Sequence, residues 1–286
     1  MAVAQTMGLQ ARTVADRDEI VAYLRTDRRY AAYALGDVDS PARRRITWAL
    51  AYDASGRPTA LGMHHEGLMA QPLFLMGEPD GVREILGSVI RPRDAYFQSS
   101  EGHEAAMREL YELETPLAML RMVVDPIGFQ PFAGPAERLG PSDVEDLNRL
   151  YQLGARTGFP ASVVEDGIYY GVRVRGRLVA AAGTHVINVR EGIGVVGNVM
   201  THADFRGHDF AKMVTSAVTA DLLNRCGEAA LNVHADNNPA IAAYSRLGYT
   251  THCRLVERLG RRRAGGWGLM RPLREAMRLT WPRDGR

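Results

Sequence analysis

The chain has 286 residues, of which 46% are hydrophobic, and its 35 lysine and arginine residues nearly balance 33 aspartate and glutamate residues. This length predicts about two domains, and no apolar run is long enough to cross a bilayer. A net charge of only +2 argues against nucleic acid as the main partner.

The start of the chain lacks a charged segment followed by an apolar one, so we expect a cytoplasmic protein without a membrane anchor. Cys226 and Cys253 show neither metal-ligand spacing nor the pattern of a disulfide framework, which fits a reducing compartment and predicts no metal site. Lys212 is the only lysine, and we interpret this bias as genomic in origin.

The first half predicts a domain over residues 1–130 that mixes helices and strands. Its expected elements are helix 16–26, strands 46–52, 59–65 and 73–76, helix 82–89, strand 95–98, helix 103–113 and strand 118–124. A linker rich in Pro and Gly covers residues 125–140.

The second half predicts a domain over residues 136–260. Its expected elements are helix 141–153 with Ser142 as cap, an irregular stretch 155–166, strands 168–174, 178–188 and 193–201, helix 210–225, strand 229–235, a short helix and strand 250–259. This order indicates an α/β fold with a mixed sheet. Residues 261–286 form a basic tail with two tryptophans, for which we favour a solvated end over a nucleic-acid or lipid contact.

The segment 193–211 carries the strongest functional signal. Its strand contains Gly194 and Gly197, which suits a strand that another backbone or a ligand approaches closely. Arg206-Gly207 supplies a turn, and apolar residues then recur at helical spacing. Because a helix N-terminus has unpaired N–H groups and the positive end of the helix dipole, this turn is predicted to cradle a pyrophosphate.

A second block follows over residues 230–249, with a strand, an Asn-Asn-Pro turn and a short helix. Asn237 can cap the helix, Pro239 suits its first turn, and Gly248 fits its end. Tyr244 then lies one turn from the end of the helix.

These two blocks, in this order, resemble the acetyl-CoA-binding half of the GCN5-related N-acetyltransferase (GNAT) superfamily. Residues 204–211 are similar to the loop Gln/Arg-x-x-Gly-x-Gly/Ala of that family. The later family block, Asn-x-x-Ala-Ile-x-x-Tyr followed by Gly-Phe/Tyr, is matched by Asn237, Ala240, Ile241, Tyr244, Gly248 and Tyr249. The resemblance is clear from about residue 136 to residue 259 and implies the acyl-CoA N-acyltransferase fold.

The resemblance further implies an N-acetyltransferase that moves an acetyl or short acyl group from acetyl-CoA to a primary amine by direct attack in a ternary complex. Backbone groups around Val199–Thr201 would pair with the pantetheine arm. The expected cofactor-binding residues are Val199, Met200, Thr201, Arg206, Gly207, His208, Asp209, Phe210, Ala211, Asn237 and Tyr244.

Two residues depart from the family loop. Asp204 stands where the family has Gln or Arg, and Asp209 stands where it usually has a small residue. A carboxylate near a pyrophosphate is repulsive, so we expect weakened cofactor binding unless the Asp209 side chain points to solvent. Without a ligand, Asp209 would simply be a favourable charge at a helix N-terminus.

Tyr244 is the candidate general acid, because a phenol stays protonated at neutral pH and can donate to a leaving thiolate. The alternative for Tyr244 is packing in the core. Two histidines near the expected cleft, His202 and His234, are candidate bases that titrate near neutral pH. His185, Glu191 or a chain of waters remain alternatives.

The first half repeats the order of elements of the second, which predicts a tandem duplication with Tyr111 near the place of Tyr244. The stretch that matches the cradle is 77–81, which is acidic and lacks arginine. We therefore expect a degenerate first copy that shapes the structure or the substrate site and does not bind CoA.

The acceptor remains open between a small-molecule amine and a peptide N-terminus or lysine, as does the oligomeric state, with a homodimer as one option. Two rival functions also remain open. One is a non-catalytic acyl-CoA-binding or regulatory module, and the other is an interaction protein that retains only the fold.

Overall fold

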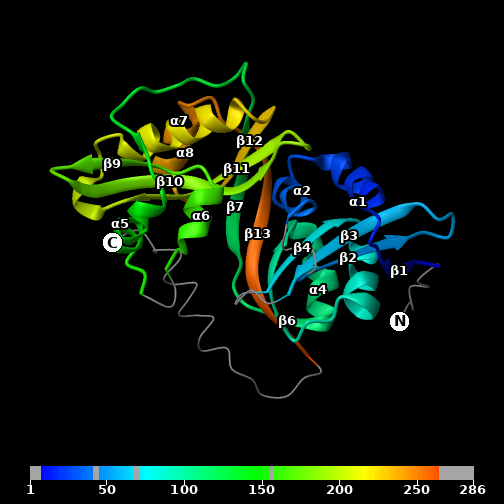
Figure 1. Cartoon of the computed structure of the whole chain (residues 1–286). Helices are drawn as coiled ribbons and strands as arrows, with labels where there is room; N and C mark the ends of the chain where they lie inside the picture. Colours follow the sequence, from blue (N-terminus) through cyan, green and yellow to red (C-terminus); the bar gives the residue numbers. More distant parts are fainter. Residues whose placement is uncertain (1–7, 41–44, 67–70, 155–157, 264–286) are drawn as a thin grey trace. The chain divides into compact units, whose positions relative to one another are not determined.

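The computed structural model describes residues 8–40, 45–66, 71–154 and 158–263. The chain divides into two compact units (Figure 1). Of the described residues, those up to Leu120 and those at 253–263 form the first unit, and Arg121–His252 form the second. Most of the predicted basic tail, from residue 264 on, lies outside the described residues.

The first unit is built on a mixed sheet. Its elements are β1 (Gln10–Thr13), α1 (Arg17–Leu24), α2 (Ala32–Asp37), β2 (Ile46–Tyr52), β3 (Pro58–His65), β4 (Pro72–Gly77), α3 (Pro79–Glu84), a π-helical turn (Ile85–Val89), β5 (Asp94–Ser99), α4 (Glu104–Leu110) and β6 (Tyr111–Leu113). The strand order is β1-β2-β3-β4-β5, followed by β13 (Thr250–Arg262) from the end of the chain, and β6 also pairs with β13. Only β4 and β5 run parallel among these registered pairs.

The second unit has the same plan. Its elements are β7 (Leu117–Val124), β8 (Glu137–Arg138), α5 (Val144–Leu150), α6 (Ala161–Asp166), β9 (Tyr170–Val174), β10 (Arg177–Asn188), β11 (Ile193–Thr201), α7 (Phe210–Leu223), β12 (Glu228–His234) and α8 (Asn238–Ser245). The strand order is β8-β9-β10-β11-β12-β7, and β11 and β12 run parallel. The mixed α/β sheet predicted from the sequence is therefore confirmed.

Each unit thus consists of antiparallel strands, then a parallel pair, then one further strand. In the first unit that last strand is β13, from the end of the sequence, and in the second it is β7, from the end of the first half. The repeated plan supports the predicted duplication, with the final strands of the two copies exchanged between the units.

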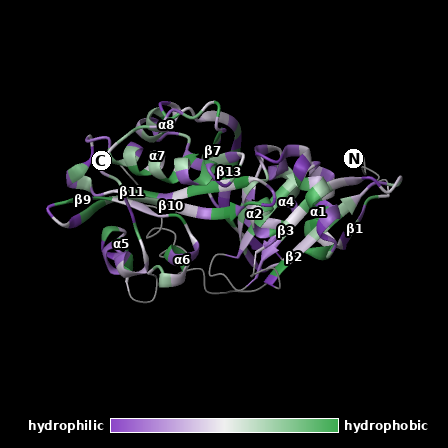
Figure 2. Ribbon diagram, turned by 45° about the horizontal axis from the view of Figure 1, so that its top comes forward, coloured by the Kyte–Doolittle hydropathy of each residue, from purple (hydrophilic) through white to green (hydrophobic). Residues whose placement is uncertain are grey.

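In the second unit the helices cover both faces of the sheet. Figure 1 shows α7 and α8 on one face and α5 and α6 on the other. A core of Leu147, Leu150, Val164, Tyr169 and Leu178 lies under α5 and α6. In Figure 2 the helices carry hydrophilic and hydrophobic stretches side by side, as expected for helices that bury one face. None of the helices within the described residues is long and apolar enough to cross a membrane.

Some predicted elements differ from the structure. The stretch expected to be irregular contains α6, which follows an extended Pro160 and buries Val164. The helix expected at 141–153 begins as a 3-10 turn, and its first amide, at Gly140, donates to the Asp143 carboxylate at 2.9 Å instead of being capped through Ser142. The helix expected at 103–113 ends at Leu110, so Tyr111 lies in β6 and is not a helical counterpart of Tyr244.

Candidate active site

The turn between β11 and α7 is open and has an unusual backbone. A 3-10 turn at Ala203–Phe205 leads into Arg206, after which Gly207 has a φ of 80° and Asp209 a φ of 59°. A Cβ atom at Gly207 would meet no other atom within 4 Å. Residues 206–209 are all exposed. The turn therefore leaves free space above its glycine, as a phosphate cradle requires.

The N-terminus of α7 supplies donors to this space. Asp209 is the N-cap residue, but its side chain makes no capping hydrogen bond. No hydrogen bond joins the amides of Phe210, Ala211 or Lys212 to another described residue, whereas the Met213 amide donates to the Asp209 carbonyl at 3.0 Å. These three N–H groups and the helix dipole favour an anion at this end of α7.

The Asp209 carboxylate is held by the only lysine of the chain. Lys212 Nζ lies 3.1 Å from Asp209 Oδ1, and the Asp209 side chain is 53% exposed. The same ammonium lies 3.8 Å from the centre of the Phe132 ring. The Lys212 ammonium offsets the charge of Asp209, and about half of the Asp209 side chain faces solvent. Asp209 therefore repels an anion less than an unpaired, enclosed carboxylate would.

Strands β11 and β12 separate next to this turn. Their last registered pair is Val196 with Leu231, and the rest of β11 has no registered partner on β12 among the described residues. The close neighbours of Gly194 and Gly197 among the described residues are side chains and not a backbone. A Cβ at Gly194 would lie 2.5 Å from Leu222, and one at Gly197 would lie 1.9 Å from the His185 ring.

A bulge interrupts β11 where it leaves β12. Gly197 pairs with Gly183 and Met200 with Ala181 on β10, so two residues of β11 lie opposite a single residue of β10. Asn198, in this bulge, has a φ of 52°. Val199, Met200 and Thr201, the residues expected to pair with a pantetheine arm, follow directly.

The second sequence block forms α8. Asn237 is its N-cap, and the Asn237 side chain accepts a hydrogen bond from the Ala240 amide at 3.2 Å, which confirms the capping role. Gly248 ends the helix with a φ of 91°, and a Cβ there would lie 1.9 Å from the Gly128 carbonyl oxygen.

Tyr244 is 6% exposed, and its hydroxyl makes no hydrogen bond to a described residue. Burial raises the pKa of Tyr244 well above its usual range, so the phenol stays protonated at neutral pH.

The two candidate bases have different surroundings. Arg177 donates to His202 Nε2 at 2.8 Å, while His202 Nδ1 lies 3.3 Å from the Asp204 amide nitrogen and 3.7 Å from the Asp204 carboxylate. His234, the last residue of β12, instead pairs through Nδ1 with the carboxylate of Asp236, a residue that the sequence analysis did not single out. The spacing His-x-Asp just after a strand could have drawn attention to it.

Three further candidates come from the sequence, one for the cradle and two as alternative bases. His208 Nδ1 lies 3.0 Å from the Arg206 carbonyl oxygen, and its ring stacks on Phe210 with centres 5.6 Å apart. His185 is exposed, with its ring against Gly197. Glu191 is buried in the turn between β10 and β11.

The corresponding turn of the first unit is filled by the protein itself. Gly77 has a φ of 104°, and a Cβ there would lie 2.2 Å from the Tyr23 hydroxyl and 2.3 Å from the Thr59 carbonyl oxygen. A Cβ at Gly81 would lie 2.7 Å from Ala60. Helix α3 also begins with Pro79, which has no N–H to offer. These contacts agree with the expectation that the first copy does not bind CoA.

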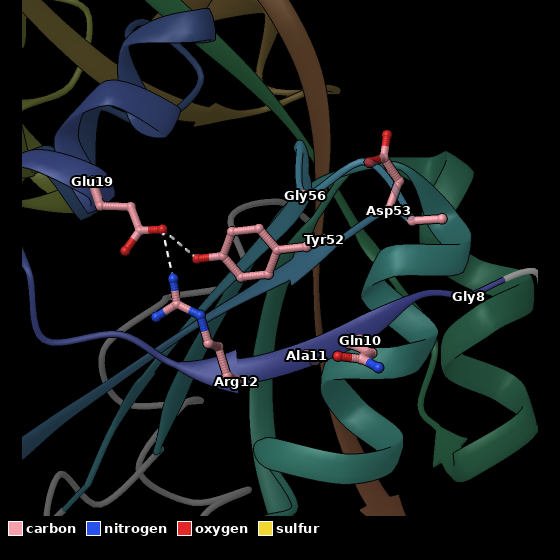
Figure 3. A pocket seen from close by; sticks show the side chains of 9 residues that line it. Gly8, Gln10, Ala11, Arg12, Glu19, Tyr52, Asp53 and Gly56 are labelled. Atoms are coloured by element: carbon pink, nitrogen blue, oxygen red, sulfur yellow. Dashed lines mark hydrogen bonds and ion pairs between the residues drawn. The ribbon is translucent and has the colours of Figure 1, made fainter.

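A hollow of about 570 Å³ lies in the first unit and shares no residue with the cradle (Figure 3). The Arg12 guanidinium and the Tyr52 hydroxyl both donate to Glu19 Oε1, at 2.8 and 2.5 Å. Because its polar groups satisfy one another, we assign this hollow no part in the chemistry.

Comparison with known proteins agrees with this geometry. Residues 169–258, from the residue before β9 into β13, match a family model described as FR47-like protein. The structure is similar to a Drosophila protein (14% identity, TM-score 0.64, 89% of this chain and 99% of that chain). It is also similar to a GCN5-related N-acetyltransferase from Kribbella flavida (18% identity, TM-score 0.58, 84% and 95%).

A third similar structure is a tandem GNAT protein from the clavulanic acid biosynthesis pathway, without AcCoA (15% identity, TM-score 0.54, 91% and 100%). A search of curated proteins by sequence finds no match. The fold that the resemblance to the GNAT superfamily implies is thereby confirmed, because the chain shares the fold of these structures.

Proposed function

We propose that the second unit transfers an acetyl or short acyl group from acetyl-CoA to a primary amine by direct attack in a ternary complex. The observation that carries this proposal is the N-terminus of α7. Three amides there have no hydrogen-bond partner among the described residues, and they adjoin an open glycine turn beside the point at which β11 leaves β12. The amides suit a diphosphate, and the separated strand suits an extended arm that pairs with backbone groups.

Acetyl-CoA supplies the acyl group as a thioester, and the protein has to hold it and manage two protons. In this proposal Arg206, Gly207, His208, Asp209, Phe210 and Ala211 form the diphosphate cradle. Backbone groups of Val199, Met200 and Thr201 align the arm and polarise the carbonyl. Asn237 contacts the arm while it caps α8.

Tyr244 is the proposed general acid. Its protonated hydroxyl has no hydrogen-bond partner among the described residues, so the proton is available to a departing thiolate. The thiolate takes this proton, and the phenolate regains one when the amine loses its own.

His234 is the proposed general base. Its Nδ1–H faces the Asp236 carboxylate, which holds the ring so that Nε2 can take a proton from the substrate ammonium, and the neutral amine then attacks the thioester carbonyl. We assign His202 a structural role instead, because the guanidinium of Arg177 occupies its Nε2. A chain of waters is the alternative for proton removal.

The first experiment measures binding by thermal shift. A ligand present at 100 times its dissociation constant stabilises a protein by about 2.7 kcal/mol, so CoA and acetyl-CoA should both raise the melting temperature. No shift with either compound would contradict the proposal and leave a protein that retains only the fold.

The second experiment incubates the protein and acetyl-CoA with small amines and with peptides that carry free N-termini or lysines. Release of free thiol that depends on one amine class identifies the acceptor. Tight CoA binding without thiol release from any amine would instead support a non-catalytic acyl-CoA-binding module.

A further inference from the structure

Two tyrosines meet at the bulge of β11. The Tyr151 hydroxyl donates to the carbonyl oxygen of Asn198, and Asn198 Nδ2 donates to the Tyr169 hydroxyl at 3.0 Å. Tyr151 directly follows α5 and Tyr169 directly precedes β9, so both come from the second unit. The backbone and the side chain of Asn198 are thus held by two separate phenols.

A third aromatic residue fixes the positions of these phenols. The Phe159 ring lies between them, with ring centres 5.2 Å from Tyr151 and 6.2 Å from Tyr169. Phe159 is itself held by α5, because its amide donates to Asn148 Oδ1 at 2.7 Å.

The Tyr169 ring also lies directly on Gly183, where a Cβ would be 2.2 Å from it. Gly183 pairs with Gly197, the residue before the bulge. The hydroxyls of both tyrosines therefore have little freedom to turn away from Asn198.

This arrangement determines the direction of a backbone amide. The carbonyl of Asn198 and the N–H of Val199 belong to one planar trans peptide, so they point in opposite directions. When Tyr151 holds the carbonyl, the Val199 N–H is oriented as well. Asn198 is moreover in a left-handed conformation, with a φ of 52°, that non-glycine residues adopt rarely.

We propose that Tyr151 and Tyr169 are positioning residues for acyl transfer, which set the Val199 amide by clamping Asn198. The inference rests on the function proposed above. It goes beyond the sequence motifs, because neither tyrosine belongs to the two blocks that suggested that function. Neither tyrosine needs to touch a substrate for this role.

The main experiment compares Tyr151→Phe and Tyr169→Phe with Tyr170→Phe. Each change removes one phenol oxygen and keeps the ring. Tyr170 is the matched control, because its hydroxyl is 3.5 Å from Asp221 of α7 and has no contact with Asn198. A displacement of about 1 Å at a reacting centre costs roughly a hundred-fold in rate, so we expect kcat to fall about ten- to a hundred-fold in Tyr151→Phe. Affinity for CoA should change less than about two-fold, since the α7 amides remain.

A second readout does not depend on activity. Amide hydrogen exchange of the peptide spanning residues 195–201 should accelerate roughly three- to ten-fold in Tyr151→Phe, as expected for one lost hydrogen bond, and stay unchanged in Tyr170→Phe. If this peptide exchanges as slowly in Tyr151→Phe as in the wild-type protein, Tyr151 does not hold Asn198, whatever the protein catalyses. Faster exchange with an unchanged kcat would overturn the positioning role alone.

A double-variant comparison tests the route through Asn198. Tyr169→Phe and Asn198→Gly remove the same hydrogen bond, and glycine adopts a positive φ without strain. The double variant should therefore be no slower than Asn198→Gly alone, whereas multiplied losses would show that Tyr169 acts by another route. If the wild-type protein transfers no acyl group to any amine, the proposed function fails and the positioning role fails with it, while the exchange measurement still reports whether the clamp exists.

Discussion

The departure of Asp209 from the family loop gives the sharpest test of the cradle. Asp209→Asn removes one negative charge beside the unpaired amides of α7 and keeps a residue that tolerates a positive φ. Lys212 is present in both proteins, so its attraction for an anion cancels from the comparison. The substitution should therefore tighten the binding of CoA.

The size of the effect follows from Coulomb's law. With about 53% of the Asp209 side chain exposed, water-like screening applies, and one charge pair at roughly 7 Å is worth about 0.6 kcal/mol, or about 1.2 kcal/mol for a diphosphate with two charges. A Debye length of about 30 Å at 0.01 M salt leaves about 0.9 kcal/mol, and one of about 8 Å at 0.15 M leaves about 0.5 kcal/mol. The dissociation constant should fall about five-fold at the lower salt concentration and about two-fold at the higher one.

Isothermal titration with CoA at both salt concentrations measures this difference. Glu165→Gln is the control, because Glu165 is an exposed carboxylate on α6 of the same unit, outside the cradle. An affinity for CoA that is unchanged or weaker in Asp209→Asn at low salt would refute the assignment of the diphosphate to the start of α7.

Further predictions concern the chemistry and the stability of the fold. Tyr244→Phe should lower kcat at least about ten-fold and leave CoA affinity within about two-fold, and steady-state kinetics with equal turnover would remove Tyr244 from the mechanism. Asp236→Asn should lower kcat about ten-fold because it releases the His234 ring, and His234→Gln should lower kcat about a hundred-fold. If kcat of Asp236→Asn equals that of the wild type, a chain of waters and not His234 removes the proton. Gly248→Ala should lower the free energy of unfolding by at least about 2 kcal/mol in urea titrations, because a left-handed φ and a backbone oxygen both oppose a Cβ there. Burial raises the pKa of Asp37 to about 6, so its ionisation destabilises the fold fully above about pH 6 and not at all below about pH 4; Asp37→Asn should raise the melting temperature near pH 8 only.

Where the pattern was long and periodic, the sequence predicted the fold closely. β11 spans Ile193–Thr201 and β2 spans Ile46–Tyr52, both at the predicted bounds. Short elements were missed because they carry too few residues to show a period. β1 has four largely exposed residues, and α2 has six without a side-chain cap.

In the candidate site, too, the features that depend on neighbouring residues were predictable and those that depend on distant residues were not. The glycine turn, the Asn237 cap and the Asp209–Lys212 pair all depend on residues within four positions of one another, and such spacings can be interpreted in a sequence. The pairing of Lys212 with Asp209 was nevertheless not predicted. In the clamp, Asn198 contacts Tyr169, which is 29 residues away along the chain, and Tyr151, which is 47 residues away. Only the pairing of β9 and β11 on either side of β10, together with the packing of α5 on β10, brings such residues together, so no local pattern could have predicted the clamp.

The enclosure of Lys212 has a practical consequence. This side chain is the only lysine in the sequence, and it is 7% exposed, with its ammonium held between Asp209 and the Phe132 ring. An antibody against acetyl-lysine should therefore give almost no background from the folded protein itself. In a reaction with peptide acceptors, the immunoblot signal would report modification of the peptide and not self-labelling.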